Sequence, residues 1–271
     1  MTYLELINKL SLTDCGAPSL EAAEIIRIAD GHSREWCLLN QNTPLSDSVT
    51  AILNQRLAGI PLQYICGEAW FFGYRFHVTP HCLIPQPDTE HLVSQALKHI
   101  HANTKLLDLC TGSGCIPISI LNESDDVSAV AIDISKDALA IAQKNAEFHN
   151  VSNRLAFLCS DVLFDDPSTL ISDADIITSN PPYINSDVIP KLSPEVQHEP
   201  RIALDGGADG MIFYNHFISV LSKHMKDKAI MLLEIGYDQA QRIQRLCDTN
   251  GLCCRLHKDF GGNLRVAEIN K

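Results

Sequence analysis

Short apolar runs rich in β-branched residues alternate with segments of helical periodicity from Lys105 to the end of the chain. This alternation constrains the fold most strongly, because strands separated by helices pair in parallel and build a doubly wound sheet. The expected strands are 105–109, 128–132, 155–159, 174–179, 229–235, 252–257 and 264–269, and the expected helices are 114–121, 136–149, 211–225 and 237–249. The loop 259–263 is too short for a parallel crossover. The prediction is therefore an α/β fold with a mostly parallel seven-stranded sheet whose last strand is antiparallel.

Two smaller regions precede this sheet domain, which is expected to cover 85–271. Residues 1–66 have helical apolar spacing and predict a small helical domain, in which no residue suggests catalysis. Their pattern leaves two interpretations open, a plain helical bundle or a module that docks a macromolecule. Alternating aromatic residues around Gly73 predict a β-hairpin linker over 67–84. Asp88 or Thr89 is expected to cap the helix that follows the linker.

Composition narrows the classes of partner. The net charge of −12 supplies no general basic surface for phosphates, which weakens a nucleic-acid substrate but leaves room for a local patch. The ten cysteines include no Cys-x-x-Cys pair, so no metal is expected. We expect no signal peptide, because the first ten residues include Glu5 and Lys9 and no long apolar run, and the sequence has no apolar run of about eighteen residues. We expect a soluble, reduced, cytoplasmic protein without a membrane partner.

A glycine-rich turn follows the first expected strand of the sheet. Gly112 and Gly114 allow the backbone to approach a ligand closely, and the helix that begins there favours an anionic group. Asp133 ends the next strand, about twenty residues later, where a ribose-binding carboxylate is found in nucleotide-binding sheets. These two strand ends predict part of a nucleoside site.

The third expected strand ends in a further acid. Asp161 is placed to bind an adenine amine, and Val162 to pack on the adenine ring. For Asp161 alone, a cap on the loop is an equally good interpretation. Together the three strand ends predict one nucleoside-shaped site.

The fourth expected strand stops at Asn180, which two prolines and a tyrosine follow. Pro181 keeps Asn180 out of helical angles, and Pro182 has no N–H to donate. The Asn180 side-chain carbonyl and the Pro181 backbone carbonyl are then two free acceptors that suit a planar NH2 group. Tyr183 offers a ring face beside them.

These motifs resemble those of class I S-adenosylmethionine-dependent methyltransferases that act on planar amines and amides. The residues that carry this resemblance are Asp108, Cys110, Gly112 and Gly114, followed by Asn180, Pro181, Pro182 and Tyr183. Four further stretches are similar to the peptide chain release factor glutamine N5-methyltransferases, namely 56–67, 83–90, 195–210 and 233–236. Val162 departs from this family, in which an aromatic residue is common at that position.

The resemblance implies a reaction, a cofactor and a partner. The enzyme would use S-adenosylmethionine to methylate the glutamine of the Gly-Gly-Gln motif in class 1 release factors, acting as a monomer whose helical domain docks the substrate. The implied cofactor-binding residues are Cys110, Thr111, Gly112, Ser113, Gly114, Asp133, Asp161, Val162 and Asn180. The implied catalytic residues are Asn180, Pro181 and Tyr183, and the implied substrate-binding residues are these three and Pro182.

Two other functions are compatible with the same motifs. Adenine-N6 methyltransferases of nucleic acids also carry Asn-Pro-Pro-Tyr, although the stretch 186–201 here has more acidic than basic residues and does not suit phosphates. A non-catalytic protein that binds the cofactor and docks a partner is the second alternative. The intact Asn180, Gly112, Gly114 and Asp133 argue against it.

Overall fold

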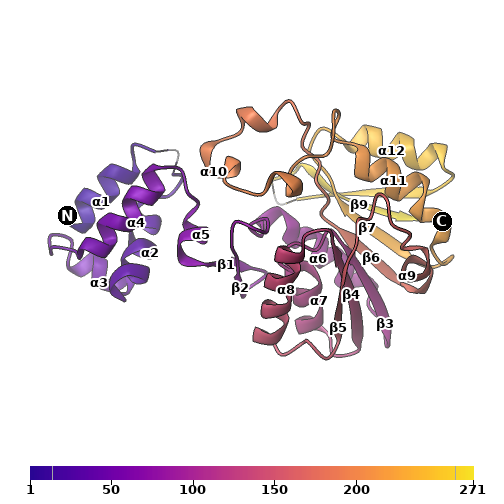
Figure 1. The fold of residues 1–271 in the computed structure, drawn as a ribbon, viewed down its shortest axis with the longest axis horizontal. Helices are drawn as coiled ribbons and strands as arrows, with labels where there is room; N and C mark the ends of the chain where they lie inside the picture. The colour runs from indigo at the N-terminus through magenta and orange to yellow at the C-terminus, as the bar shows by residue number, and fades with distance from the viewer. Residues whose placement is uncertain (14, 260) are drawn as a thin grey trace. The chain divides into compact units, whose positions relative to one another are not determined.

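The computed structural model describes residues 1–13, 15–259 and 261–271, and the chain forms two compact units (Figure 1). One unit comprises Met1–Gly67 and Ser193–His198, and the other comprises Glu68–Leu192 and Glu199–Lys271. Phe260, which belongs to the predicted loop 259–263, lies outside the described residues. Each unit has its own hydrophobic core.

The first unit is helical, which confirms the predicted helical region. Its N-terminal helices are α1 (Tyr3–Leu10), α2 (Pro18–Asp30), α3 (Arg34–Leu39), α4 (Asp47–Leu57) and α5 (Leu62–Cys66). Helix α1 begins at a capping box, in which the Thr2 hydroxyl accepts from the Glu5 N–H at 3.3 Å and the Glu5 carboxylate accepts from the Thr2 N–H at 2.9 Å. Apolar residues of α1, α2, α3 and α4 form its core.

A segment from late in the chain completes this unit. It contains helix α10 (Pro194–Gln197). The buried Arg56 guanidinium donates to Glu21 at 2.5 Å, to Glu195 at 2.7 Å and to the Ile60 carbonyl at 2.6 Å. Gly59 has a φ of +86°, and a Cβ there would lie 2.9 Å from the Pro194 Cβ. These contacts account for the Arg and Gly of the 56–67 motif.

The second unit opens with the predicted hairpin, which is confirmed. Strands β1 (Glu68–Phe71) and β2 (Tyr74–His77) pair antiparallel. Phe72 and Gly73 form the turn with φ values of 51° and 78°, the left-handed pair that tight hairpins require. Phe72 tolerates this conformation with its N–H donated to the Glu90 carboxylate at 2.8 Å.

A short helical stretch links the hairpin to the sheet. It consists of the 3-10 turn η1 (Pro87–Thr89), helix α6 (Glu90–Ala96) and the 3-10 turn η2 (Leu97–His99). Thr89 occupies the N-cap position of α6 as predicted, but its side chain makes no capping hydrogen bond. Asp88 instead pairs with Arg265 at 2.9 Å, and the Thr89 hydroxyl has partners at the candidate site described below.

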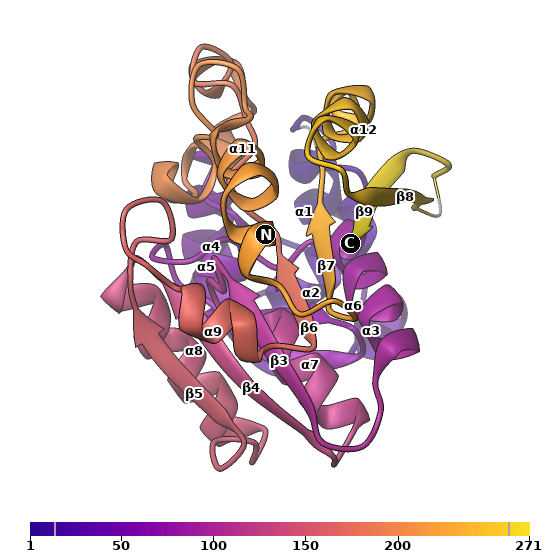
Figure 2. The same cartoon turned by 90° about the vertical axis from the view of Figure 1, so that its right-hand side faces the viewer.

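The sheet has the strand order β5-β4-β3-β6-β7-β9-β8 (Figure 2). Its strands are β3 (Thr104–Leu109), β4 (Val127–Asp133), β5 (Leu155–Cys159), β6 (Ile176–Ser179), β7 (Ile230–Glu234), β8 (Cys253–Lys258) and β9 (Leu264–Asn270). Strand β9 runs antiparallel to both of its neighbours, β7 and β8, and the pairs among β5, β4, β3, β6 and β7 are parallel. This confirms the predicted seven-stranded, mostly parallel sheet with an antiparallel last strand.

Helices cover both faces of this sheet. The longer ones are α7 (Cys115–Glu123), α8 (Lys136–Phe148), α9 (Ser168–Asp173), α11 (Ile212–Ser219) and α12 (Ala240–Thr249), with shorter 3-10 turns η3 (Ile189–Lys191), η4 (Arg201–Ala203) and η5 (Leu221–His224). The predicted helix 211–225 is divided into α11 and η5, and α9 was not predicted. None of the described helices combines the length and apolar character of a membrane span.

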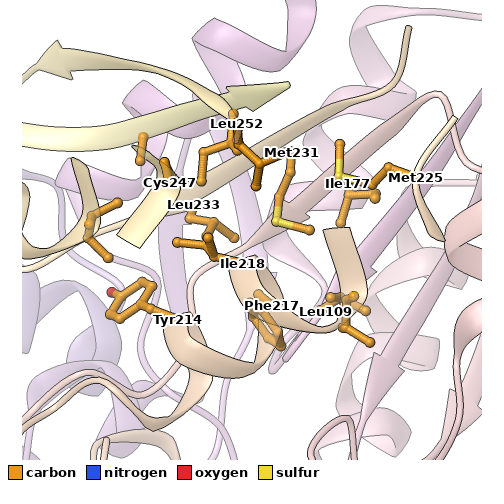
Figure 3. Packing of buried hydrophobic residues seen from close by; sticks show 14 of the residues in the cluster. Leu109, Ile177, Tyr214, Phe217, Ile218, Met225, Met231, Leu233, Cys247 and Leu252 are labelled. Carbon is orange, nitrogen blue, oxygen red and sulfur yellow. The ribbon is translucent and has the colours of Figure 1, made fainter. Parts of the chain in front are cut away.

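Each central strand contributes alternate residues to two cores, as the strand period of two requires. Leu109 and Ile177 face the cluster that α9, α11 and α12 cover (Figure 3). Leu107 belongs to the same cluster. Leu106 and Ile176, one residue earlier, face the cluster that α6 and α7 cover. Burial on both faces explains why these strands read as continuous apolar runs.

Candidate active site

A cavity of about 690 Å³ lies in the second unit at the carboxyl ends of β3, β4 and β6. Open α/β sheets bind their ligands at this edge. The lining comes from the linker (81–86 and Thr89), the β3–α7 turn (110–113), the end of β4 (133–135), the loop after β5 (160–163), the end of β6 (Asn180 and Pro182) and the segment 200–213. The predicted residues Gly114, Pro181 and Tyr183 are not part of this lining.

The β3–α7 turn lines the cavity with residues 110–113 and contains two buried hydroxyls. Cys110 and Gly112 have φ values of 59° and 56°, and the Thr111 N–H between them donates to the Ile132 carbonyl at 3.0 Å. A Cβ on Gly112 would meet no atom within 4 Å, so its backbone borders open space. The buried hydroxyls of Thr111 and Ser113 have no hydrogen-bond partner among the described residues. Orphaned polar atoms beside an open backbone fit a polar ligand.

The packing of helices α7 and α8 requires a glycine at position 114. It precedes α7 with a φ of +78°, and a Cβ there would lie 3.0 Å from Ile118 Cδ1 and 3.1 Å from Ala142 Cβ. A glycine at this position therefore allows α7 and α8 to pack closely. Its predicted contact with a cofactor stays a prediction.

Asp133 shapes the turn and faces the cavity. Its Oδ2 accepts from the Gly112 N–H at 2.8 Å, and its Oδ1 accepts from the Ser135 N–H at 2.9 Å. Burial raises the pKa of this carboxyl, although both hydrogen bonds favour the ionised form. Each carboxylate oxygen has a second lone pair, so Asp133 can also accept from a ligand hydroxyl.

Asp161 and Val162 both line the cavity. The Asp161 Oδ1 accepts from the Leu163 N–H at 2.9 Å, so the loop-capping interpretation holds in the structure. Val162 is buried in the core and still reaches the cavity wall. Their predicted contacts with adenine remain compatible with these positions and stay predictions.

Asn180 lies at the end of β6, where two hydrogen bonds fix its surroundings. The Ser179 hydroxyl donates to the Leu109 carbonyl at 2.7 Å and ties β6 to β3. The Asn180 Nδ2 donates to the Thr89 hydroxyl at 3.1 Å, and that hydroxyl donates to the Glu234 carboxylate at 2.6 Å. The amide NH2 of Asn180 is therefore directed at Thr89, which leaves its Oδ1 for another partner.

The chain after Asn180 is held by the segment 204–210. Ile184 donates its N–H to the Leu204 carbonyl at 2.9 Å, and its own carbonyl accepts from the Gly206 N–H at 2.8 Å. A Cβ on Gly206 would lie 2.7 Å from the Tyr183 Cα, and one on Gly210 would collide with the Tyr183 carbonyl. Gly206 and Gly210 of the 195–210 motif thus allow this segment to pack directly against the Tyr183 backbone.

Three carboxyls near the cavity were not predicted as site residues. Glu234 is buried at the end of β7, and burial raises its pKa to about 7. Burial likewise raises the pKa of Asp108 to about 7. Its Oδ1 accepts from the Thr178 hydroxyl at 2.6 Å, and its Oδ2 has no partner among the described residues. Glu199 accepts from the Ile84 N–H at 2.9 Å, and burial raises its pKa to about 7.

The sequence also does not predict that Thr89 and Glu234 form a hydrogen-bonded pair. The only signal was that each lies in a stretch noted for its family resemblance, 83–90 and 233–236. Thr89 was interpreted as a helix cap, because the local pattern does not reveal a partner that is 145 residues away in the chain.

Comparison with known proteins places these features in a family. Residues 87–229 match the family described as Methyltransferase small domain, and residues 5–67 match the PrmC N-terminal domain. The release factor glutamine methyltransferase of Clostridium acetobutylicum is 38% identical over 218 residues, covering 79% of this chain and 76% of that protein. The release factor glutamine methyltransferase of Caulobacter vibrioides is 35% identical over 266 residues, covering 94% and 91%.

A solved structure supports the fold. The catalytic domain of hMettl16, in complex with an RNA hairpin, is similar with a TM-score of 0.56 and 16% sequence identity, covering 74% of this chain and 76% of that one. At this identity the likeness extends to the methyltransferase fold alone.

Proposed function

This chain belongs to the release factor glutamine methyltransferase family, and we propose that it methylates the side-chain nitrogen N5 of the glutamine in the Gly-Gly-Gln motif of class 1 release factors. The methyl donor is S-adenosylmethionine. One observation carries the proposal, namely that the Asn180 NH2 is bound to Thr89 and its carbonyl oxygen is left for a substrate amide.

The cavity fits the cofactor. Its volume of about 690 Å³ lies in the range of small-molecule sites. The turn from Cys110 to Ser113 would hold the methionine part through backbone groups and the two orphaned hydroxyls, and Asp133 would accept from the ribose. Asp161 and Val162 would bind the adenine. When bound, the cofactor supplies a methyl group that its sulfonium already activates.

The chain's own residues then have to orient a poor nucleophile. An amide nitrogen shares its lone pair with the carbonyl, so the enzyme gains most by aligning it with the S–CH3 bond. The Asn180 Oδ1 and the Pro181 carbonyl accept the two amide protons and stabilise the positive charge that develops on nitrogen. The N–CH3 bond forms as the S–CH3 bond breaks, and the nitrogen loses a proton to water.

Pro182 and Tyr183 would form the substrate side of the site. Pro182 lines the cavity, and Tyr183 is partly buried against the core beside it. We propose that the Tyr183 ring contacts the glutamine side chain of the substrate. Release factors would be the protein partner, and the acidic chain would act as a monomer that binds no nucleic acid.

Labelled methyl transfer tests the proposed function. The protein is incubated with S-adenosylmethionine carrying a labelled methyl group and a purified class 1 release factor, and the labelled residue is located by mass spectrometry. We expect the label on the glutamine of Gly-Gly-Gln, and none on a release factor in which that glutamine is replaced by alanine. Label on adenine of added nucleic acid, with none on the release factor, would favour the adenine-N6 alternative instead.

The helical unit would dock the release factor, because it contains no cavity lining and no candidate catalytic group. A chain that starts at Glu68 should bind the cofactor normally and methylate the intact release factor poorly. A short Gly-Gly-Gln peptide serves as the matched control, since its kcat/KM should be the same for both forms of the enzyme. An unchanged kcat/KM for the intact release factor would exclude the docking role.

A further inference from the structure

Three polar side chains from distant parts of the chain, of which Thr89 and Glu234 are buried, meet at the substrate side of the cavity. Thr89 precedes α6, Glu234 ends β7 and Asn180 follows β6. Thr89 and Glu234 are each only 2% exposed. The Thr89 hydroxyl lies 2.6 Å from the Glu234 Oε2 and 3.1 Å from the Asn180 Nδ2. Within the proposed mechanism, Asn180 alone has been assigned a role.

The chemistry of the three groups determines the direction of both hydrogen bonds. An ionised carboxylate only accepts hydrogen bonds, whereas a hydroxyl has one proton to donate. While Glu234 is ionised, the Thr89 proton therefore goes to Glu234, and the Thr89 oxygen accepts from Asn180. An amide with its NH2 bound in this way cannot rotate by 180° without losing that bond.

This direction matters for a substrate that is itself an amide. The glutamine NH2 offers two donors, so it needs acceptors opposite it. A rotated Asn180 would present its own NH2, and two donors would face each other. The two orientations of Asn180 have nearly the same shape, so packing alone distinguishes them poorly.

We propose that Thr89 and Glu234 are a positioning pair that holds the Asn180 carbonyl oxygen toward the substrate amide. This inference rests on the proposed function and names the residues on which its specificity for an NH2 group depends. It also gives one physical reason for two stretches of family resemblance, 83–90 and 233–236, which are far apart in sequence and meet at Asn180.

The surroundings hold both members of the pair in place. The Thr89 N–H donates to the Gln86 carbonyl at 3.0 Å, which fixes the η1 turn. The Tyr214 hydroxyl donates to the Glu234 carbonyl at 2.8 Å, and Glu234 pairs with Val266 in the sheet. The pair is thus part of the rigid core and not of a surface loop.

Replacing Thr89 tests the pair. Thr89→Val keeps the side-chain shape and removes the hydroxyl, and Thr89→Ser restores it. We expect Thr89→Val to lower kcat in single-turnover methyl transfer by roughly ten- to a hundredfold, while the cofactor Kd changes by less than about threefold. Thr89→Ser should recover most of the rate. Ser94→Ala removes a hydroxyl from α6 that donates to the Glu90 carbonyl at 2.9 Å, away from Thr89 and Asn180, and it should leave kcat unchanged.

A double-mutant cycle separates positioning from simple stability. In an Asn180→Ala background there is no amide to orient, so adding Thr89→Val should cost little further rate. Thermal unfolding checks that each variant is folded, and Thr89→Ala replaces Thr89→Val if the valine does not fit.

Two outcomes would overturn the positioning pair. One is a Thr89 variant without the hydroxyl that keeps kcat within about twofold of the parent. The other is a full rate loss from Thr89→Val even when Asn180 is already alanine. Both outcomes are compared with a parent enzyme that is shown to methylate the glutamine of the release factor. A parent that labels no release factor contradicts the proposed function itself, which is a different result.

Discussion

The two walls of the cavity are built in different ways. On the proposed cofactor side, Asp133 is held by the backbone N–H groups of Gly112 and Ser135, which belong to adjacent turns of the sheet. On the proposed substrate side, Asn180 is held through side chains alone, by Thr89 and then Glu234. Backbone donors follow from the fold, whereas a relay of side chains depends on each residue's identity. We therefore expect the substrate side to be more sensitive to single substitutions.

The largest effect should come from Asn180→Ala. It removes one of the two acceptors for the substrate NH2, and the contact is stronger in the transition state than in the ground state. We expect kcat to fall by about 10²–10³ in single-turnover methyl transfer with saturating release factor, by analogy with the loss of one preorganised polar partner. Cofactor titration in parallel should show a much smaller change. If the variant keeps most of the parent's kcat, Asn180 only ends strand β6 and has no role in catalysis.

On the other wall, Asp133→Ala should weaken cofactor binding by about 1.5–3 kcal/mol, the range for a hydrogen bond to a charged group. Part of this loss will come from the turn, because the Gly112 N–H loses its acceptor. Asp133→Asn separates the two contributions, since its amide oxygen can still accept from Gly112. Calorimetry on both variants measures the affinities, and an unchanged Kd for the alanine variant would remove Asp133 from the site.

Acid should weaken the substrate side, and Glu234→Gln separates this effect from the titration of Asp108 and Glu199, whose pKa burial also raises to about 7. Burial raises the pKa of Glu234 to about 7, against the opposing effects of the Thr89 hydrogen bond and the Arg265 charge, with Asp88 adding to the rise and Tyr183 opposing it. Below that pKa the carboxyl is protonated and can donate to Thr89, whose proton is then free to turn toward Asn180. We expect kcat to fall by about tenfold per pH unit below the Glu234 pKa.

The cofactor Kd is the internal control for this experiment, because Glu234 is not part of the cavity lining. Stability should change in the opposite direction. A carboxyl whose folded pKa is raised stabilises the fold below its unfolded pKa of about 4.3, and this contribution is lost as pH rises through about 7. A kcat that stays flat from pH 8 to pH 6 would contradict the role of the ionised carboxylate.

The smallest effect is expected from Thr111→Val on the cofactor side. The Thr111 hydroxyl is buried and has no hydrogen-bond partner among the described residues. Its loss should therefore lower the free energy of unfolding in urea only slightly, because its interaction with the Asp108 carboxyl is not a well-formed hydrogen bond. The cofactor affinity should fall by about 0.5–1.5 kcal/mol. A loss of stability with an unchanged Kd would assign the hydroxyl to the fold.

The same contrast explains what the sequence could predict. The sheet, its antiparallel last strand and the position of the turn at Gly112 follow from local patterns, because periodicity and glycine chemistry act over a few residues. The sequence places Thr89 correctly at the start of α6 but does not predict the role of its hydroxyl, because that hydroxyl donates to a distant carboxylate and not to the helix. The positive φ of Phe72 could likewise not be predicted from local sequence, since its N–H donates to Glu90, which is 18 residues away.

The membership of Ser193–His198 in the helical unit has a consequence for the order of events during synthesis. Arg56 is made early, but its partner Glu195 follows 139 residues later, after strands β3 to β6. N-terminal regions generally fold first as the chain leaves the ribosome. Here Glu195 cannot reach Arg56 until the ribosome has passed residue 195, by which point the residues of β3 to β6 have already been synthesised. The N-terminal part of this protein is therefore completed in the second half of its own translation.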